Sequence, residues 1–114
     1  MNKEYDKGEL LLTTLIKSHT KVPQLYTSLA NIYLEKNEFK RAIAVFQDGL
    51  NHNPDDIKLA LSLADLYEQQ GSFEAAVEIY EALLKTNPDL DIATNNLASV
   101  LNEHYVNDVD LKKA

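Results

Sequence analysis

The side chains of this 114-residue chain that could do chemistry are few, because it has three histidines and no cysteine. His19, His52 and His104 lie far apart, and no two of them have the spacing of an HExxH motif or share one face of a helix. We therefore expect surface or helix-end histidines rather than metal ligands or catalytic bases. The absence of cysteine excludes disulfides, thiolate zinc sites and cysteine nucleophiles.

Other candidate motifs are incomplete. Asn107, Asp108 and Asp110 have part of the spacing of a calcium loop, but its glycine and closing glutamate are missing. Ser18 and His19 are neighbours, but no third group that would orient the histidine is evident. With only three glycines, the chain has no glycine-rich loop for a phosphate. The sequence predicts no catalytic residues, no metal and no cofactor.

The charge balance restricts the partners. Eighteen acidic residues against eleven Lys and Arg give a net charge of −7, which repels phosphate backbones and anionic lipid. We expect a neutral to basic protein or peptide partner and no nucleic acid. The longest apolar run, residues 42–46, is far shorter than the roughly 20 residues that cross a bilayer, so we expect no membrane insertion. Because the first residues do not form a signal peptide, a cytoplasmic location is expected, or a periplasmic one if a longer parent carries the signal.

The elements that position these side chains follow a 34-residue repeat. Residues 23–56 align with residues 57–90, and 11 of the 34 positions are identical. Such a period is typical of stacked supersecondary units. The identical pairs are Leu25/Leu59, Ser28/Ser62, Leu29/Leu63, Ala30/Ala64, Tyr33/Tyr67, Phe39/Phe73, Ala42/Ala76, Leu50/Leu84, Asn53/Asn87, Pro54/Pro88 and Asp55/Asp89.

Each unit contains two stretches with helical spacing of apolar residues, as Leu29, Ile32 and Tyr33 illustrate for the first stretch. Asn37 and Gly71 separate the two stretches, and these residue types tolerate positive φ best. Each unit is therefore predicted to be two helices joined by a tight turn.

Polar residues and prolines indicate the helix ends. Ser72 is expected to cap the second helix of its unit through its hydroxyl. Pro54 and Pro88 end the preceding helices, because proline fits poorly beyond the first turn. Asp55 and Asp89 are expected to cap the helices that follow.

These residues resemble the tetratricopeptide repeat family. Its pattern is a large residue, Leu-small, Tyr, Ala with an aromatic four residues later, a small residue and Pro. The first unit has Tyr26, Leu29, Ala30, Tyr33, Ala42, Phe46, Gly49 and Pro54. The second has Ala60, Leu63, Ala64, Tyr67, Ala76, Tyr80, Leu83 and Pro88, and departs from the pattern at Ala60 and Leu83. The resemblance implies an all-α fold, a right-handed superhelical solenoid of antiparallel helix pairs.

Partial units flank the two complete ones. Residues 4–18 fit a lone second helix of a truncated unit, and residues 91–114 a partial repeat. In the partial repeat we expect an irregular linker over 105–110, before the start of a further helix at 111–114. We infer a fragment of a longer tetratricopeptide protein. The run 87–104 also resembles bacterial repeat proteins linked to secretion or exopolysaccharide export.

The six tyrosines raise a second interpretation, a stacking platform for bases or sugars. Tyr33, Tyr67 and Tyr80 coincide with core positions of the family, which leaves Tyr5, Tyr26 and Tyr105 less constrained. We therefore expect the tyrosines to serve packing.

The resemblance also implies a binding surface, because the first helices of such arrays line a concave groove that holds peptides. These positions are polar and mildly acidic here, so amides and hydroxyls can bond a peptide backbone, while Asp65 and Glu68 can pair with Lys or Arg. Leu61 offers one apolar contact. The implied groove residues are Gln24, Thr27, Ser28, Asn31, Glu35, Lys58, Leu61, Ser62, Asp65, Glu68, Gln69, Asn95, Asn96, Ser99, Asn102 and Glu103.

Two known groove types fit only in part. A groove that clamps the acidic C-termini of chaperones needs Lys and Arg, and only Asn31 fits it; Thr27, Ser62, Ile92 and Asn96 do not. The asparagine ladder of the O-linked N-acetylglucosamine transferase is represented by Asn96 alone. A carboxylate clamp is therefore disfavoured.

Two classes of function remain. The first is a non-catalytic adaptor whose groove binds a partner segment. The second is a structural spacer or self-associating module that uses exposed end helices. An enzyme is the least expected class, because no catalytic motif is present.

Overall fold

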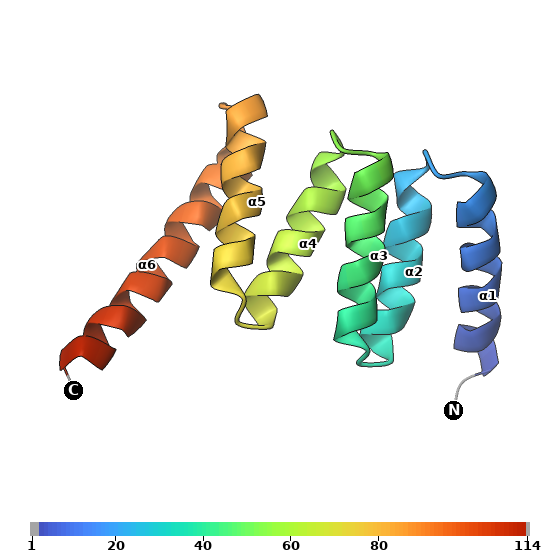
Figure 1. The fold of residues 1–114 in the computed structure, drawn as a ribbon, viewed down its shortest axis with the longest axis horizontal. Helices are drawn as coiled ribbons and strands as arrows, with labels where there is room; N and C mark the ends of the chain where they lie inside the picture. Colours follow the sequence, from blue (N-terminus) through green and yellow to red (C-terminus); the bar gives the residue numbers. More distant parts are fainter. Residues whose placement is uncertain (1–2, 114) are drawn as a thin grey trace. The chain divides into compact units, whose positions relative to one another are not determined.

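A computed structural model describes the backbone of residues 3–113 and the side chains of residues 4–103. This part of the chain consists of helices joined by short loops, with no strand (Figure 1). The all-α prediction is confirmed. The helices are α1 (Lys3–Ser18), α2 (Pro23–Glu35), α3 (Phe39–His52), α4 (Ile57–Gln69), α5 (Phe73–Thr86) and α6 (Asp91–Lys113).

The helices belong to two compact units, residues 1–60 and 61–114. In the first unit, α2 packs against both α1 and α3. Its core contains Tyr26, Ala30, Ala42 and Phe46, each no more than 2% exposed. These are apolar residues at helical spacing, so burial of one face of each helix holds the unit together.

One main-chain carbonyl fixes the loop between α1 and α2. The Thr20 oxygen accepts hydrogen bonds from the Tyr26 hydroxyl at 3.1 Å and from Asn53 Nδ2 at 2.9 Å. The Asn53 amide also donates to the Gly49 carbonyl at 3.1 Å, and the Tyr26 and His52 rings stack with centroids 6.3 Å apart. The end of α3 is thereby tied to the start of α2.

Polar contacts join α1 to α2 in the same unit. The Tyr33 hydroxyl donates to Glu9 Oε2 at 3.1 Å, and Lys36 Nζ donates to Glu9 Oε1 at 3.2 Å. The Tyr5 hydroxyl donates to Glu35. Burial and the bond to Glu9 raise the pKa of Tyr33, and the bond to Glu9 raises the pKa of Lys36.

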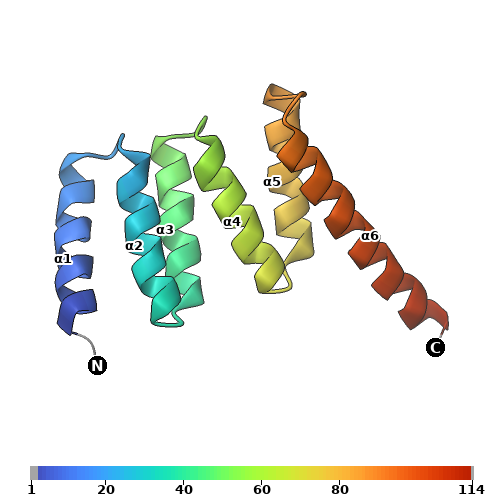
Figure 2. The same cartoon turned by 180° about the vertical axis from the view of Figure 1, so that it is seen from behind.

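In the second unit, α5 packs against α6. Ala76 and Tyr80 of α5 and Ala93 and Val100 of α6 are all fully buried. Ala93 and Val100 lie two helical turns apart, which gives α6 one apolar stripe. Figure 2 shows α6 in front of α5, and Figure 1 shows the reverse view.

The predicted turns are present. Asn37 has φ 60° and Gly71 has φ 78°, both in the left-handed region. The Glu38 amide donates to the Tyr33 carbonyl, and the Ser72 amide to the Tyr67 carbonyl, both at 2.8 Å. Both turns thus end their helix with a main-chain bond that spans five residues.

The helix caps differ from our expectation. Ser72 makes no side-chain cap bond to α5. At the start of α4, Asp56 rather than Asp55 is the cap, since its Oδ1 accepts from the Leu59 amide at 2.8 Å. Asp89 is exposed, and α6 begins two residues after it.

The irregular linker that we expected over 105–110 is wrong, because α6 continues without interruption to Lys113. Asn37 and Gly71 end the first helices of the complete units, whereas the corresponding position here is a tyrosine, a type that rarely adopts positive φ. Residues 91–113 contain neither Gly nor Pro, so nothing in this segment favours a break.

Candidate functional site

The predicted groove residues lie on α2, α4 and α6, which are the first helices of the two complete repeats and of the partial repeat. On α2, Gln24, Asn31 and Glu35 are exposed and Thr27 is half-buried. Glu35 accepts the Tyr5 hydroxyl bond, which raises the pKa of Tyr5 and orients this carboxylate toward α1. Lys58 is exposed in the first turn of α4.

The second unit carries most of the remaining positions. On α4, Asp65 and Gln69 are exposed, and their side chains form a hydrogen bond of 2.9 Å one helical turn apart. Leu61, Ser62 and Glu68 on α4 are half-buried. On α6, Asn96 is half-buried, and the exposed residues are Asn95, Ser99, Asn102 and Glu103.

A tyrosine joins two of the predicted groove residues, one on α4 and one on α6. The Tyr80 hydroxyl, from α5, donates to Glu68 Oε2 at 2.5 Å. Its oxygen also hydrogen-bonds the side chain of Asn96. Burial and then the bond to Glu68 raise the pKa of Tyr80 well above its usual value, and the Asn96 contact lowers it by a smaller amount. Tyr80 therefore stays neutral and fixes one acid and one amide on neighbouring first helices.

From the sequence, Tyr80 is predicted to serve packing alone, and its hydrogen bonds were not predicted. The sequence does contain a signal for this hydrogen bond. Glu68 and Tyr80 in the second repeat correspond to Leu34 and Phe46 in the first repeat. An apolar pair is thus replaced by a carboxylate and a hydroxyl at once. Such a joint replacement predicts a hydrogen bond between the two positions.

The other tyrosines depart partly from the expectation. Tyr26, which we left less constrained, is fully buried, and Tyr67, which we placed in the core, is half-buried. The Tyr105 side chain lies outside the described residues. Because Tyr26, Tyr33 and Tyr80 are 9% exposed or less, these three rings offer no stacking platform.

The remaining chemical candidates lie at helix ends. His19 and His52 each place Nδ1 3.1 Å from the carbonyl oxygen four residues earlier, and Ser18 is exposed. No three His, Asp or Glu side chains within residues 4–103 are grouped to hold a metal ion. The side chains of His104, Asn107, Asp108 and Asp110 lie outside that range. Among the described residues, no helix combines the length and apolar character needed to span a membrane.

The chemistry of these described side chains suits binding. Exposed amides and carboxylates on helices can donate to and accept from an extended main chain. Glu68 and Asp65 lie on the same face of α4, three residues apart, so together they can attract a cation.

Comparison with known proteins identifies the fold. The family model described as Tetratricopeptide repeat matches residues 33–100, more than half of the chain. No curated protein sequence matches. The crystal structure of MamA protein is similar, with a TM-score of 0.73 at 18% identity, over 95% of this chain and 59% of that chain.

Two further structures are similar. MamA D159K mutant 1 has a TM-score of 0.64 at 17% identity, over 87% of this chain and 58% of that chain. PcrH in complex with the chaperone binding region of PopD has a TM-score of 0.69 at 14% identity, over 90% of this chain and 82% of that chain. Our chain spans under two-thirds of the MamA chains, and the likeness concerns the fold.

Proposed function

Since this chain belongs to the tetratricopeptide repeat family, we propose that it is a non-catalytic scaffold that binds an extended protein segment along its first helices. A protein-interaction role agrees with the family and with the acidic, polar character of these helices. PcrH, a fold neighbour, is described in complex with the chaperone binding region of PopD. By analogy, the proposal places a bound protein segment on α4 and α6 of this chain.

The observation that supports the proposal most is the Glu68–Tyr80–Asn96 contact. A tyrosine that is itself 0% exposed fixes a carboxylate on α4 and an amide on α6. Side chains that are held in place lose less entropy when they bind a ligand. The fixed carboxylate, with Asp65 one turn away, favours a segment that presents Lys or Arg.

The test uses a library of displayed 12-residue peptides and the purified chain. We expect selected peptides to contain Lys or Arg, and we expect their binding to shift the amide resonances of residues on α4 and α6. Asp65→Lys should weaken binding of a selected peptide about tenfold. The reason is that a contact between the Asp65 carboxylate and a peptide Lys or Arg contributes about 1–2 kcal/mol to binding.

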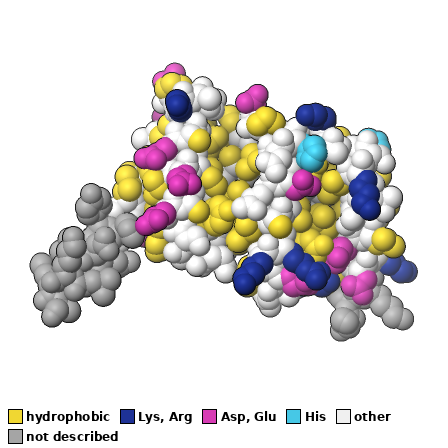
Figure 3. All heavy atoms as spheres, viewed as in Figure 1, with side chains coloured by type: hydrophobic (Ala, Val, Ile, Leu, Met, Phe, Trp, Pro, Cys, Tyr) yellow, Lys and Arg dark blue, Asp and Glu magenta, His cyan; other side chains and the backbone are white. Residues whose placement is uncertain are grey.

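The matched control is Glu81→Lys, the same type of charge reversal at an exposed position of α5. Figure 3 shows acidic side chains over α5, where Glu74, Glu78 and Glu81 are exposed. If Glu81→Lys weakens binding as much as Asp65→Lys, overall charge explains the affinity. The proposal then fails.

A further inference from the structure

The net charge of the chain is concentrated in the second unit. Residues 1–60 contain eight acidic residues and eight Lys and Arg, whereas residues 61–114 contain ten acidic residues and three Lys. The first unit is therefore neutral, and the whole charge of −7 lies in the second. A field of one sign attracts a ligand of the opposite sign to that part of a protein. A basic partner is thus directed to the second unit.

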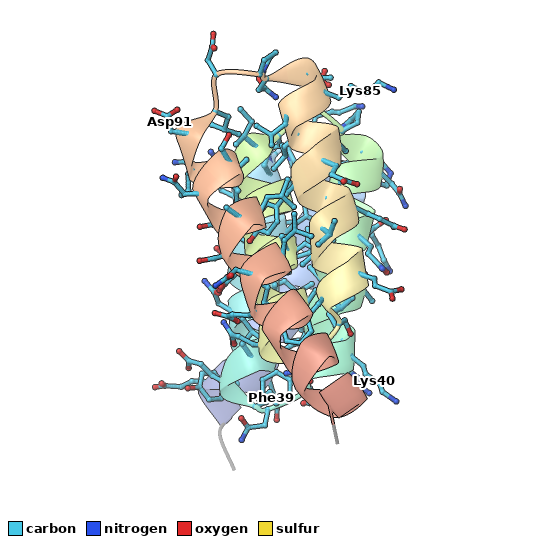
Figure 4. All side chains as sticks on the ribbon, turned by 90° about the vertical axis from the view of Figure 1, so that its left-hand side faces the viewer. Phe39, Lys40, Lys85 and Asp91 are labelled. Atoms are coloured by element: carbon cyan, nitrogen blue, oxygen red, sulfur yellow. The ribbon has the colours of Figure 1, made fainter. Side chains whose placement is uncertain are left out.

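The second unit offers its own carboxylates little compensation. Residues 61–103 contain one basic residue, Lys85, and no histidine. Lys85 lies in the last turn of α5, at the same end of the α5–α6 pair as Asp91 (Figure 4). The stretch of α4 that carries Asp65 and Glu68 thus supplies no cation for these two carboxylates.

The hydrogen bonds around Tyr80 use up donors and leave acceptors. The Tyr80 hydroxyl has one hydrogen, which it donates to Glu68 Oε2 at 2.5 Å. The side chain of Asn96 hydrogen-bonds the same hydroxyl oxygen, so the Asn96 amide is the donor, and its Oδ1 remains as an acceptor. Glu68 Oε1 remains as well. Because both side chains contact one hydroxyl, a single ligand can reach both.

Asp65 adds a third acceptor in the same way. Its Oδ2 accepts a hydrogen bond of 2.9 Å from Nε2 of Gln69, which leaves Oδ1. Asp65 and Glu68 are three residues apart on α4 and share one face of the helix. The groups left for a ligand are therefore two carboxylate oxygens and one amide oxygen, and none of them donates.

Arginine fits such a set of acceptors better than lysine. A guanidinium has five N–H donors in one fixed plane, so it can bond to acceptors from two helices at once. An ammonium group has three donors on one atom and is more strongly hydrated, so it loses more when it enters a half-buried site. Glu68 and Asn96 are half-buried, and Tyr80 is 0% exposed. Desolvation therefore favours the guanidinium.

We propose that Asp65, Glu68 and Asn96 form a receptor for an arginine side chain of a bound protein segment, and that this receptor selects arginine over lysine. The inference rests on the proposed function and adds the chemical identity of the anchoring side chain. Glu68 and Asp65 bind the charge directly. Tyr80 is a positioning residue, because it holds the Glu68 carboxylate without contacting the ligand.

The test compares four versions of one peptide selected in the display experiment. They differ only at the basic residue whose replacement by alanine weakens binding most, which is made arginine, lysine, asymmetric dimethylarginine or citrulline. Isothermal titration calorimetry with the full chain measures each Kd. We expect the arginine version to bind about tenfold more tightly than the lysine version. Dimethylarginine keeps the charge but blocks donors, so it should bind no better than lysine, and neutral citrulline should bind most weakly.

Two variants test the receptor residues. Glu68→Gln turns an amide donor toward the ligand, and Tyr80→Phe removes the bond that holds Glu68, so each should bring the lysine and arginine Kd values close together. Tyr80→Phe should fold, because Phe46 has the corresponding position in the first repeat, and circular dichroism checks this. The control is Glu78→Gln, which removes the same charge at an exposed position of α5 and should leave the preference for arginine unchanged.

The outcomes separate this inference from the proposed function. Equal affinity of the arginine and lysine versions would overturn the inference and leave the proposed function standing. Failure of all four versions to bind would overturn both. A preference for arginine that survives both Glu68→Gln and Tyr80→Phe, or that Glu78→Gln abolishes equally, would also overturn the inference, since the selection would then arise elsewhere.

Discussion

Tyr26 lies so close to Gly49 that the packing of α2 on α3 depends on the missing side chain. A β-carbon added at Gly49 would lie 2.9 Å from Cγ of Tyr26 and 3.1 Å from Cδ1 of Leu59. Tyr26 is fully buried and bonded to the Thr20 carbonyl, so its ring cannot move without loss of that bond.

Gly49→Ala should therefore destabilise the chain. Overpacking costs about 1–3 kcal/mol, and the better helix propensity of Ala returns about 0.5–1 kcal/mol, so we expect a net loss of about 0.5–2 kcal/mol. Urea unfolding followed by circular dichroism measures it. Gly8→Ala is the control, because its nearest contact is the flexible end of Ile32 at 3.0 Å. Equal effects of the two substitutions would contradict the packing argument.

Ala64 tests the packing of the second unit. It is 0% exposed, and Ala64→Leu adds three carbons to a filled site, which should lower the free energy of unfolding by about 1–3 kcal/mol. Ala44→Leu, at an exposed position of α3, should change it by less than about 0.5 kcal/mol. A change at Ala64 within experimental error would show that the site is not closely packed.

The two left-handed turns should respond differently to alanine and glycine. Gly71 has φ 78° and no neighbour within 4 Å of an added β-carbon, so Gly71→Ala should cost about 1 kcal/mol through backbone strain alone. Asn37→Gly should be close to neutral, while Asn37→Ala should destabilise, because asparagine tolerates φ 60° better than alanine. The midpoints of thermal unfolding of the three variants, compared with the wild type, measure these effects. A higher midpoint for Gly71→Ala would contradict the left-handed conformation of Gly71.

Alkaline pH should destabilise the fold through its tyrosines. Burial raises the pKa of Tyr80 and of Tyr26 and Tyr33 above the value of about 10 in an unfolded chain. The folded state then holds its phenolic protons more tightly than the unfolded state, so stability is complete below pH 10 and falls as the pH rises above it.

Tyr80→Phe isolates one contribution to this pH dependence. At neutral pH it should cost about 1 kcal/mol, because the bond to Glu68 is lost. Above pH 10 its stability should fall less steeply than that of the wild type, since one raised pKa is gone. Urea unfolding between pH 7 and pH 11 gives both values. Parallel curves for the two proteins would rule out this role of Tyr80.

Local rules were enough to predict the helices and turns. The spacing of Leu29, Ile32 and Tyr33 indicated a helix, and Asn37 and Gly71 indicated the two left-handed residues. The continuation of α6 was not predicted, because the family pattern was extended over a segment where its turn residue is replaced by tyrosine. Asp56 was not predicted as a cap because the role was assigned to its neighbour Asp55, which is repeated as Asp89, whereas Asp56 is not repeated.

The candidate site was harder to predict, because it depends on contacts between helices. Spacing indicated that Asp65 and Glu68 share a face of α4, but it did not show that Tyr80 lies beneath them. That contact joins side chains 12 residues apart and became evident only with the fold. A comparison of Leu34 and Phe46 with Glu68 and Tyr80 would have predicted it.

The absence of a side chain at Gly49 also limits which helices can replace α2. Tyr26 and Gly49 in the first repeat correspond to Ala60 and Leu83 in the second, and Ala60 and Leu83 are 7% and 8% exposed. Each repeat thus combines one bulky and one small residue, in opposite order. Replacing α2 alone by a helix with alanine at the position of Tyr26 would leave a void beside Gly49, and a bulky residue at position 49 would clash with Tyr26. The helix α2 can therefore be exchanged without loss of packing only together with α3.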